Sequence, residues 1–130
     1  MASLYSVPFN KLSGGQKQSI AITRSLIQDT PLIVMDEPMS ALDLEKQADL
    51  LSLLRDLSQE GKTIVLTTHN PNHALTIDSD ACFLKEGEVV AFGNSAHIIQ
   101  ENLLHVIYGE SVSLEHGIKQ DAIVFNKERI

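Results

Sequence analysis

The chain has 130 residues, of which 43% are hydrophobic and 21% charged, and its formal net charge at pH 7 is −7. This length and composition suit one globular domain and exclude a largely disordered chain. The acidic balance argues against a nucleic-acid surface, which needs clustered Lys and Arg, and no stretch is long and apolar enough to cross a membrane. We therefore expect a cytoplasmic protein without nucleic-acid partners and without direct membrane insertion.

The first half of the chain has the pattern of a helix followed by a buried strand. Residues 1–11 show no periodicity and are expected to form a connecting segment. Apolar residues at helical spacing predict a helix from Gly14 to about Gln28, which Pro31 ends. Residues 32–35 are continuously apolar and precede two acidic residues, which predicts a buried central strand of a parallel sheet.

The next patterns complete a βαβ unit. An amphipathic helix is predicted from about Leu44 to Gln59, with Gly61 as its C-cap, and residues 63–68 form the next strand. A strand, a helix and a second strand in this order give a parallel pair joined by a crossover. The predicted fold class is therefore α/β, with parallel strands and flanking helices.

The remainder of the chain predicts shorter elements. A short helix near residues 71–77 precedes strands near 81–85 and 88–91, which Glu86 and Gly87 join by a tight turn into an antiparallel edge hairpin. Two short helices (96–100 and 101–108) and two weak strands (112–114 and 122–125) follow. The single cysteine, Cys82, lies in an apolar run and is expected to be a small buried side chain in a reducing compartment.

A short polar segment at the start of the first predicted helix has the chemistry of an anion site. It consists of Ser13, Gly14, Gly15 and Gln16, preceded by Leu12. A hydroxyl and backbone N–H groups free of bulky side chains are the donors that a phosphate needs at a helix N-terminus. This segment is a candidate contact for a nucleotide.

Polar side chains also follow each predicted strand. Asp36 and Glu37 follow the first strand, where one carboxylate can hold magnesium and the other can orient a water molecule, although adjacent acids often only begin a helix. His69 follows the second strand, and a lone histidine there could equally cap a loop. Asp43 has the simpler alternative of an N-cap for the following helix. The fixed order of these features favours a nucleotide-hydrolysing site over the simpler alternatives.

One expected part of such a site is missing from the sequence. A phosphate-binding loop of the form GxxxxGKS or GxxxxGKT must lie between a strand and a helix, and no segment fits this pattern. The nearest match, Gly61 to Thr63, follows a helix and leads into a strand, and Asp56 stands where the first glycine is needed. We expect the chain to be the C-terminal portion of one domain, without the N-terminal half that carries this loop.

Together these residues resemble the ATP-binding subunit of an ABC transporter, across residues 12 to about 93. The resemblance implies a partial P-loop NTPase fold of the ABC ATPase type, in which residues 12–16 are the signature motif and residues 40–43 the D-loop. It implies that residues 32–36 are the Walker B strand, with Asp36 binding Mg²⁺. It also implies that Glu37 is the catalytic carboxylate, that His69 is the switch histidine, and that Asp43 transmits contact across a dimer.

The resemblance further implies partners and a shared cofactor. Two ATPase subunits would face each other head to tail, so that Ser13 and Gly15 touch the ATP bound by the second subunit. Transmembrane permease subunits would hold the pair at the inner face of the cell membrane. The family hydrolyses ATP, but without the phosphate loop this chain is expected to be inactive by itself.

Three interpretations of function follow, and the first is favoured. Segments 68–75 and 101–109 look similar to importers of iron-siderophore, cobalamin or molybdate type, so the chain would be an importer subunit. A non-transport ABC ATPase of DNA repair or translation is disfavoured by the acidic charge. A non-enzymatic remnant that binds an intact ATPase subunit is the third. Although the sequence has five histidines, their spacing predicts no transition-metal site.

Overall fold

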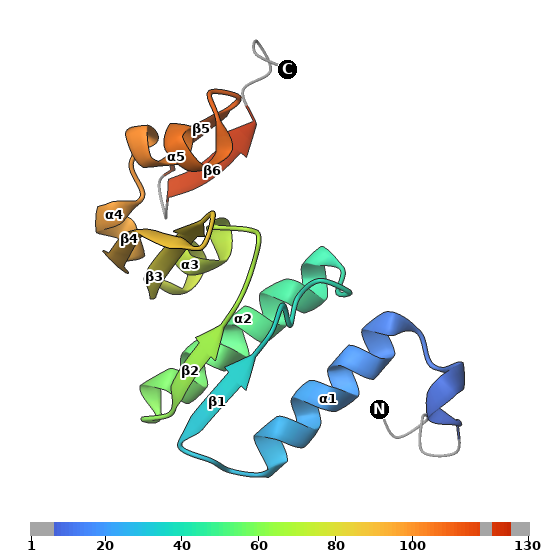
Figure 1. Cartoon of the computed structure of the whole chain (residues 1–130). Helices are drawn as coiled ribbons and strands as arrows, with labels where there is room; N and C mark the ends of the chain where they lie inside the picture. Colours follow the sequence, from blue (N-terminus) through green and yellow to red (C-terminus); the bar gives the residue numbers. More distant parts are fainter. Residues whose placement is uncertain (1–6, 118–120, 126–130) are drawn as a thin grey trace. The chain divides into compact units, whose positions relative to one another are not determined.

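The computed structural model describes residues 7–117 and 121–125, which fall into two compact units divided between His69 and Asn70. Figure 1 shows the elements of the first unit in the blue-to-green part of the ribbon. They are a short 3₁₀ helix η2, then α1, β1, α2 and β2, with the bounds Phe9–Lys11, Gly14–Ile27, Leu32–Met35, Leu44–Gln59 and Thr63–Leu66. The predicted βαβ order is confirmed, while η2 differs from the expected irregular segment because its turn is closed by backbone hydrogen bonds from Lys11 and Leu12.

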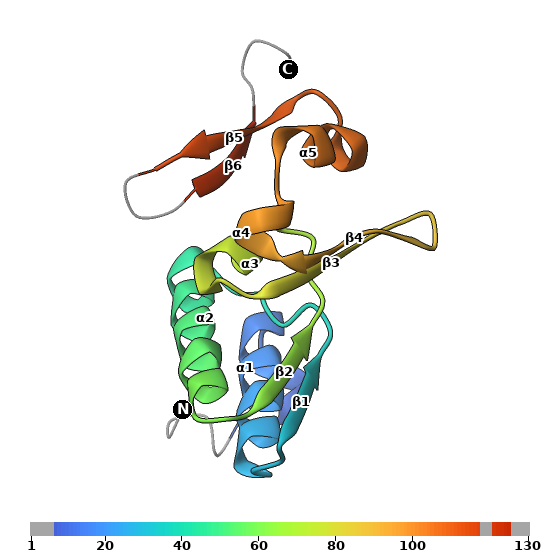
Figure 2. The same ribbon diagram turned by 90° about the vertical axis from the view of Figure 1, so that its left-hand side faces the viewer.

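The two strands of the first unit lie side by side and point the same way (Figures 1 and 2). They pair in parallel, with Leu32 opposite Thr63 and Met35 opposite Leu66, as the sequence predicted. Helix α2 makes the crossover and contacts β2. A polar pair secures the edge where the strands begin, because Lys62 Nζ donates to Asp29 Oδ1 and this hydrogen bond lowers the pKa of Asp29.

Burial in this parallel pair is one-sided. Ile33 and Met35 are buried, with 3% and 8% of their surface exposed, whereas Leu32 is 51% and Val34 69% exposed. Val65 of β2 is also exposed, at 52%. The prediction of a fully buried central strand was therefore wrong, because successive side chains of a strand point to opposite faces and the described residues cover only one of them.

The second unit consists of shorter elements, shown in yellow to red in Figure 2. In chain order they are α3, β3, β4, α4, α5, β5 and β6, with the bounds Asn72–Ile77, Asp80–Lys85, Glu88–Asn94, Ser95–Ile98, Glu101–Tyr108, Val112–His116 and Asp121–Phe125. All seven were predicted, although β4 continues past residue 91 and α4 ends before residue 99. Strands β5 and β6 form an antiparallel pair of their own.

A hydrophobic cluster of Phe83, Ile99 and Leu104 forms the centre of the second unit, and Leu104 is fully buried. Strands β3 and β4 pair antiparallel through a turn in which Glu86 and Gly87 have φ angles of 52° and 81°, as the tight-turn prediction requires. Among the described residues this hairpin forms a separate sheet rather than an edge of the parallel pair, which corrects the prediction.

The expectation for the cysteine was also wrong. Cys82 is exposed, although it lies in the apolar run of β3. The alternation along the strand buries its neighbour Phe83 against the cluster and turns Cys82 to the opposite face. An apolar run on a strand that packs on one side therefore does not bury all of its members.

Candidate functional site

The ends of β1 and β2 bring the predicted acidic and histidine residues to one edge of the sheet. Met35 and Leu66 are paired, so Asp36 and Thr67 follow at the same level, and Thr67 N donates to Met35 O at 3.0 Å. The Thr67 hydroxyl donates to Asp36 Oδ1 at 2.5 Å. The same hydroxyl oxygen accepts a hydrogen bond of 2.9 Å from Glu37 N. One threonine thus binds both members of the predicted acidic pair.

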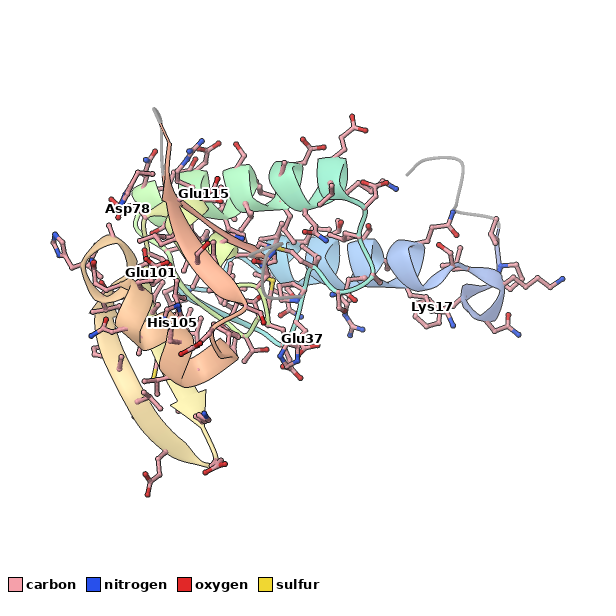
Figure 3. The ribbon with its side chains drawn as sticks, turned by 90° about the horizontal axis from the view of Figure 1, so that it is seen from above. Lys17, Glu37, Asp78, Glu101, His105 and Glu115 are labelled. Atoms are coloured by element: carbon pink, nitrogen blue, oxygen red, sulfur yellow. The ribbon has the colours of Figure 1, made fainter. Side chains whose placement is uncertain are left out.

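Glu37 and His69 are in contact in the same place. His69 Nε2 lies against Glu37 Oε1, and the exposed fractions of the two side chains are 92% and 39%. Figure 3 labels Glu37, which lies in the loop that leaves β1. The imidazole and the carboxylate are therefore both accessible to a ligand that approaches this edge.

The backbone of Glu37 has an unusual conformation. Its φ angle is 46°, in the left-handed region that residues other than Gly, Asn and Asp seldom occupy. Gln18 Nε2 donates to Glu37 O at 2.9 Å, and Ser40 N donates to the same oxygen at 3.2 Å within the turn. The peptide groups on both sides of Glu37 are thus held by hydrogen bonds.

The Ser-Gly-Gly-Gln segment forms the start of α1. Ser13 is the N-cap and forms a reciprocal capping box with Gln16, since Gln16 N donates to Ser13 Oγ at 3.1 Å and Ser13 N donates to Gln16 Oε1 at 2.9 Å. A Cβ atom at Gly15 would lie 2.8 Å from Ala41 O, closer than any side chain tolerates. Gly15 therefore lets the start of α1 approach the segment that follows the acidic pair.

Asp43 lies at the end of that segment and caps α2. Its Oδ1 accepts a hydrogen bond of 2.9 Å from Lys46 N, which is the structural role that the sequence offered as the simpler alternative. Of the predicted site residues, the structure brings together Asp36, Glu37 and His69. It also joins Ser13 to Gln16, and it sets Gly14 and Gly15 beside Ala41.

An open pocket of about 280 Å³ lies between α1 and the end of β1. Asp36 and Gln18 are among its lining residues, with apolar side chains that include Ile22 and Val34. Within the described part of the chain, no group of three or more His, Cys, Asp or Glu side chains is arranged to hold a metal ion. No helix among these residues is long and apolar enough to span a membrane.

Two residues of this arrangement, Gln18 and Thr67, were assigned no role from the sequence. The available signal for Thr67 was a hydroxyl residue directly after an apolar strand. Because Met35 pairs with Leu66, Thr67 is the next residue on β2's side and lies opposite Asp36. Gln18 lies one turn beyond Gly14 on α1, but its reach to Glu37 depends on how α1 packs beside β1. No local pattern encodes that packing.

Comparisons with solved structures define the class of the fold. The structure described as "An inward-facing conformation of a putative metal-chelate type ABC transporter" matches 98% of this chain with a TM-score of 0.81 and 32% identity. The structure described as "Dimeric Structure of MJ0796, a Bacterial ABC Transporter Cassette" matches 67% of it with a TM-score of 0.62 and 39% identity. The fold is thus the α/β P-loop NTPase fold of the ABC ATPase type.

Sequence comparisons place the chain in a family. The family model described as "AAA domain, putative AbiEii toxin, Type IV TA system" matches residues 3–73, and the chain belongs to this AAA domain family. The chain is 41% identical over 92 residues to the "Thiamine import ATP-binding protein ThiQ" of Photobacterium profundum. It spans 38% of that protein and 53% of the metal-chelate type transporter chain.

Proposed function

We propose that the chain supplies the hydrolytic and signature residues of an ATP-hydrolysing ABC importer subunit. The observation that carries this proposal is the convergence of Asp36, Glu37 and His69 at one edge of the parallel pair. Hydrolysis of ATP needs a metal-binding carboxylate, a carboxylate that orients water and a donor for the γ-phosphate. Asp36, Glu37 and His69 respectively have the side chains for these roles.

The exposed carboxylate of Asp36 fits a place in the coordination of Mg²⁺. Magnesium in nucleotide sites is held by one or two carboxylates, while water and phosphate oxygens complete the shell. Asp36 Oδ1 is fixed by the Thr67 hydroxyl, and hydrogen bonds of this kind orient ligating carboxylates at metal sites. When bound, Mg²⁺ would neutralise phosphate charge, and Glu37 would accept the proton of the attacking water.

The signature segment is proposed to act on a second nucleotide. Ser13 and Gly15 would contact ATP bound by a second ATPase subunit in a head-to-tail dimer, with Asp43 near the junction of the two. The description of the MJ0796 cassette as dimeric supports this arrangement. Permease subunits would complete the transporter and place the chain at the cytoplasmic face of the membrane.

For the transported compound we propose a metal chelate, such as an iron-siderophore or cobalamin. The metal-chelate type transporter structure matches nearly the whole chain, at 98%, whereas the MJ0796 cassette matches 67%. The greater coverage by the metal-chelate type structure than by the other solved cassette supports this choice.

The test combines this chain with a phosphate-binding loop supplied by a second polypeptide. The purified chain is mixed with a separate polypeptide that carries a GxxxxGKS or GxxxxGKT loop between a strand and a helix, and hydrolysis of Mg-ATP is measured. We expect hydrolysis only in the mixture, and a loss of about 100-fold or more for Glu37→Gln, as for removal of a general base. Glu45→Gln, in the exposed first turn of α2, is the matched control and should leave the rate unchanged.

Two outcomes would contradict the proposal. One is a complex of the two polypeptides that forms but does not hydrolyse Mg-ATP. The other is a rate that Glu37→Gln leaves unchanged. A separate thermal melt of the chain alone should show no shift with Mg-ATP, because a ligand raises the midpoint only when it binds the native state.

A further inference from the structure

We propose that Gln18 and Thr67 are positioning residues for Glu37, and that Gln18 couples movement of the signature helix α1 to this carboxylate. The inference rests on the proposed function, because it assigns Glu37 to the hydrolytic step. Neither residue is proposed to touch the nucleotide. They act by holding the backbone from which the Glu37 side chain projects.

The need for such support follows from the backbone of Glu37. A φ angle of 46° is unfavourable for a residue with a Cβ atom and persists only where the surroundings impose it. The N–H and C=O groups of Glu37 are both hydrogen-bonded. These bonds restrain rotation about both backbone torsions of the residue, and therefore the direction of its side chain.

Thr67 provides the first restraint from the neighbouring strand. Its hydroxyl has one hydrogen to donate and lone pairs to accept, and it uses both functions, toward Asp36 Oδ1 and from Glu37 N. Because Thr67 N is also bonded to Met35 O, the hydroxyl is anchored by the strand pairing itself. A single side chain therefore restrains both the carboxylate of Asp36 and the backbone N–H of Glu37.

Gln18 provides the second restraint from α1. Its Nε2 donates to Glu37 O at 2.9 Å in a partly buried position, nineteen residues earlier in the chain. The other donor to this oxygen, Ser40 N, belongs to the same local turn and moves with it. Gln18 is therefore the donor that links the position of Glu37 to that of another element.

The start of α1 is built to transmit movement. The capping box between Ser13 and Gln16 closes its first turn, and Gly15 lies so close to Ala41 that an added Cβ atom would stand 2.8 Å from Ala41 O. A ligand that draws Ser13 toward itself must displace Gln18 with the helix. In a head-to-tail dimer, the nucleotide that Ser13 contacts belongs to the second subunit. Binding of that nucleotide would therefore move Gln18 and, through its hydrogen bond, Glu37.

The first experiment uses the full chain alone and requires no nucleotide. Amide hydrogen exchange at Glu37 is measured by NMR for Thr67→Val, which removes the hydroxyl but keeps the shape, and for Thr67→Ser, which retains it. We expect exchange to accelerate about tenfold in the first variant and to stay near the parent rate in the second, because one hydrogen bond is lost. Equal exchange in the parent chain and Thr67→Val would overturn the role of Thr67.

The role of Gln18 is tested by Gln18→Met, which removes the donor at similar length, and Gln18→Lys, which supplies another donor. The amide resonances of Glu37, Met39 and Ser40 should shift in Gln18→Met and move back toward the parent in Gln18→Lys. Gln28→Met, at the exposed C-cap of the same helix, is the control and should leave them unchanged. No shift in Gln18→Met would overturn the coupling.

The second experiment repeats the hydrolysis assay in the mixture described above. We expect Gln18→Met and Thr67→Val to lower kcat about tenfold with KM for ATP nearly unchanged, since positioning affects the transition state. If Glu37→Gln abolishes hydrolysis and these variants do not lower it, the inference fails and the proposed function stands. If Glu37→Gln itself has no effect, the proposed function fails, whatever the exchange data show.

Discussion

The two units of the molecule differ in whether they carry candidate site residues and in where those residues lie relative to the buried side chains. In the first unit, the candidate residues lie at the edge of a parallel pair with one apolar face exposed, and α1 has no buried residue among those described. In the second unit, Phe83, Ile99 and Leu104 form an enclosed cluster, yet none of the proposed nucleotide-site residues lies there. The first unit has a core of its own, which includes Ile33, Met35 and Leu54, but its candidate site lies outside that core at the exposed strand ends.

The largest expected effects come from truncating one core side chain in each unit. Leu54 of α2 is 1% exposed and Leu104 of α5 is fully buried. Each substitution, Leu54→Ala or Leu104→Ala, should lower the free energy of unfolding by about 2–5 kcal/mol, through lost burial and the cavity left behind. Urea unfolding measures the loss, and hydrogen exchange shows which unit opens.

We expect Leu54→Ala to accelerate exchange in β1 and β2, and Leu104→Ala to do so in β3 and β4. Equal acceleration in both units by either variant would contradict the division into two units. Leu53→Ala is the control, because Leu53 lies beside Leu54 on α2 but is 41% exposed.

A smaller effect, specific to the second unit, concerns pH. His73 of α3 is 8% exposed, and burial lowers its pKa from the ordinary 6.5 because the charged form is poorly solvated. As the pH falls below 6.5, the unfolded chain binds a proton that the folded chain does not, so stability declines toward the folded-state pKa. The contribution of His73 to stability is therefore fully present only above its ordinary pKa.

Urea midpoints between about pH 8 and pH 5 test this expectation. His73→Gln should reduce the decline, whereas His97→Gln, an exposed position on α4, should leave it unchanged. Identical pH profiles for the parent chain and His73→Gln would show that burial of His73 does not contribute to the pH dependence of stability.

A still smaller effect is expected at the hairpin turn of the second unit. Glu86 has a φ angle of 52°, which Asn adopts more readily than Glu. Glu86→Asn should raise the free energy of unfolding by about 0.5 kcal/mol. Glu60→Asn is the control, since Glu60 has a φ angle of −78° and no strain to relieve, and an equal gain there would refute the explanation.

The smallest change in stability is expected at the exposed sheet face of the first unit. Val34→Lys should alter the free energy of unfolding by no more than about 0.5 kcal/mol, because Val34 is 69% exposed. The uncovered apolar face should instead promote self-association, which the lysine reduces. Urea unfolding measures the first effect and sedimentation the second, with Leu44→Lys on α2 as the control, and a monomeric parent chain would contradict the expectation.

Much of the candidate site could be predicted locally. The acids directly after β1, and His69 three residues after the end of β2, are recognisable because each follows an apolar strand. Parallel pairing then brings them to the same edge. Thr67 and Gln18 were given no role from the sequence, because the role of each depends on a hydrogen bond to Glu37, which is distant in the chain.

The sequence by itself determined the order of helices and strands, the parallel pairing and the residues at the strand ends, because periodicity and caps act over a few neighbouring residues. Only the tertiary structure decided which strand face is covered, which turned Cys82, Leu32 and Val34 outward. It also decided the left-handed conformation of Glu37 and its two supports. Burial and side-chain hydrogen bonds join residues distant in the chain, and no local pattern specifies them.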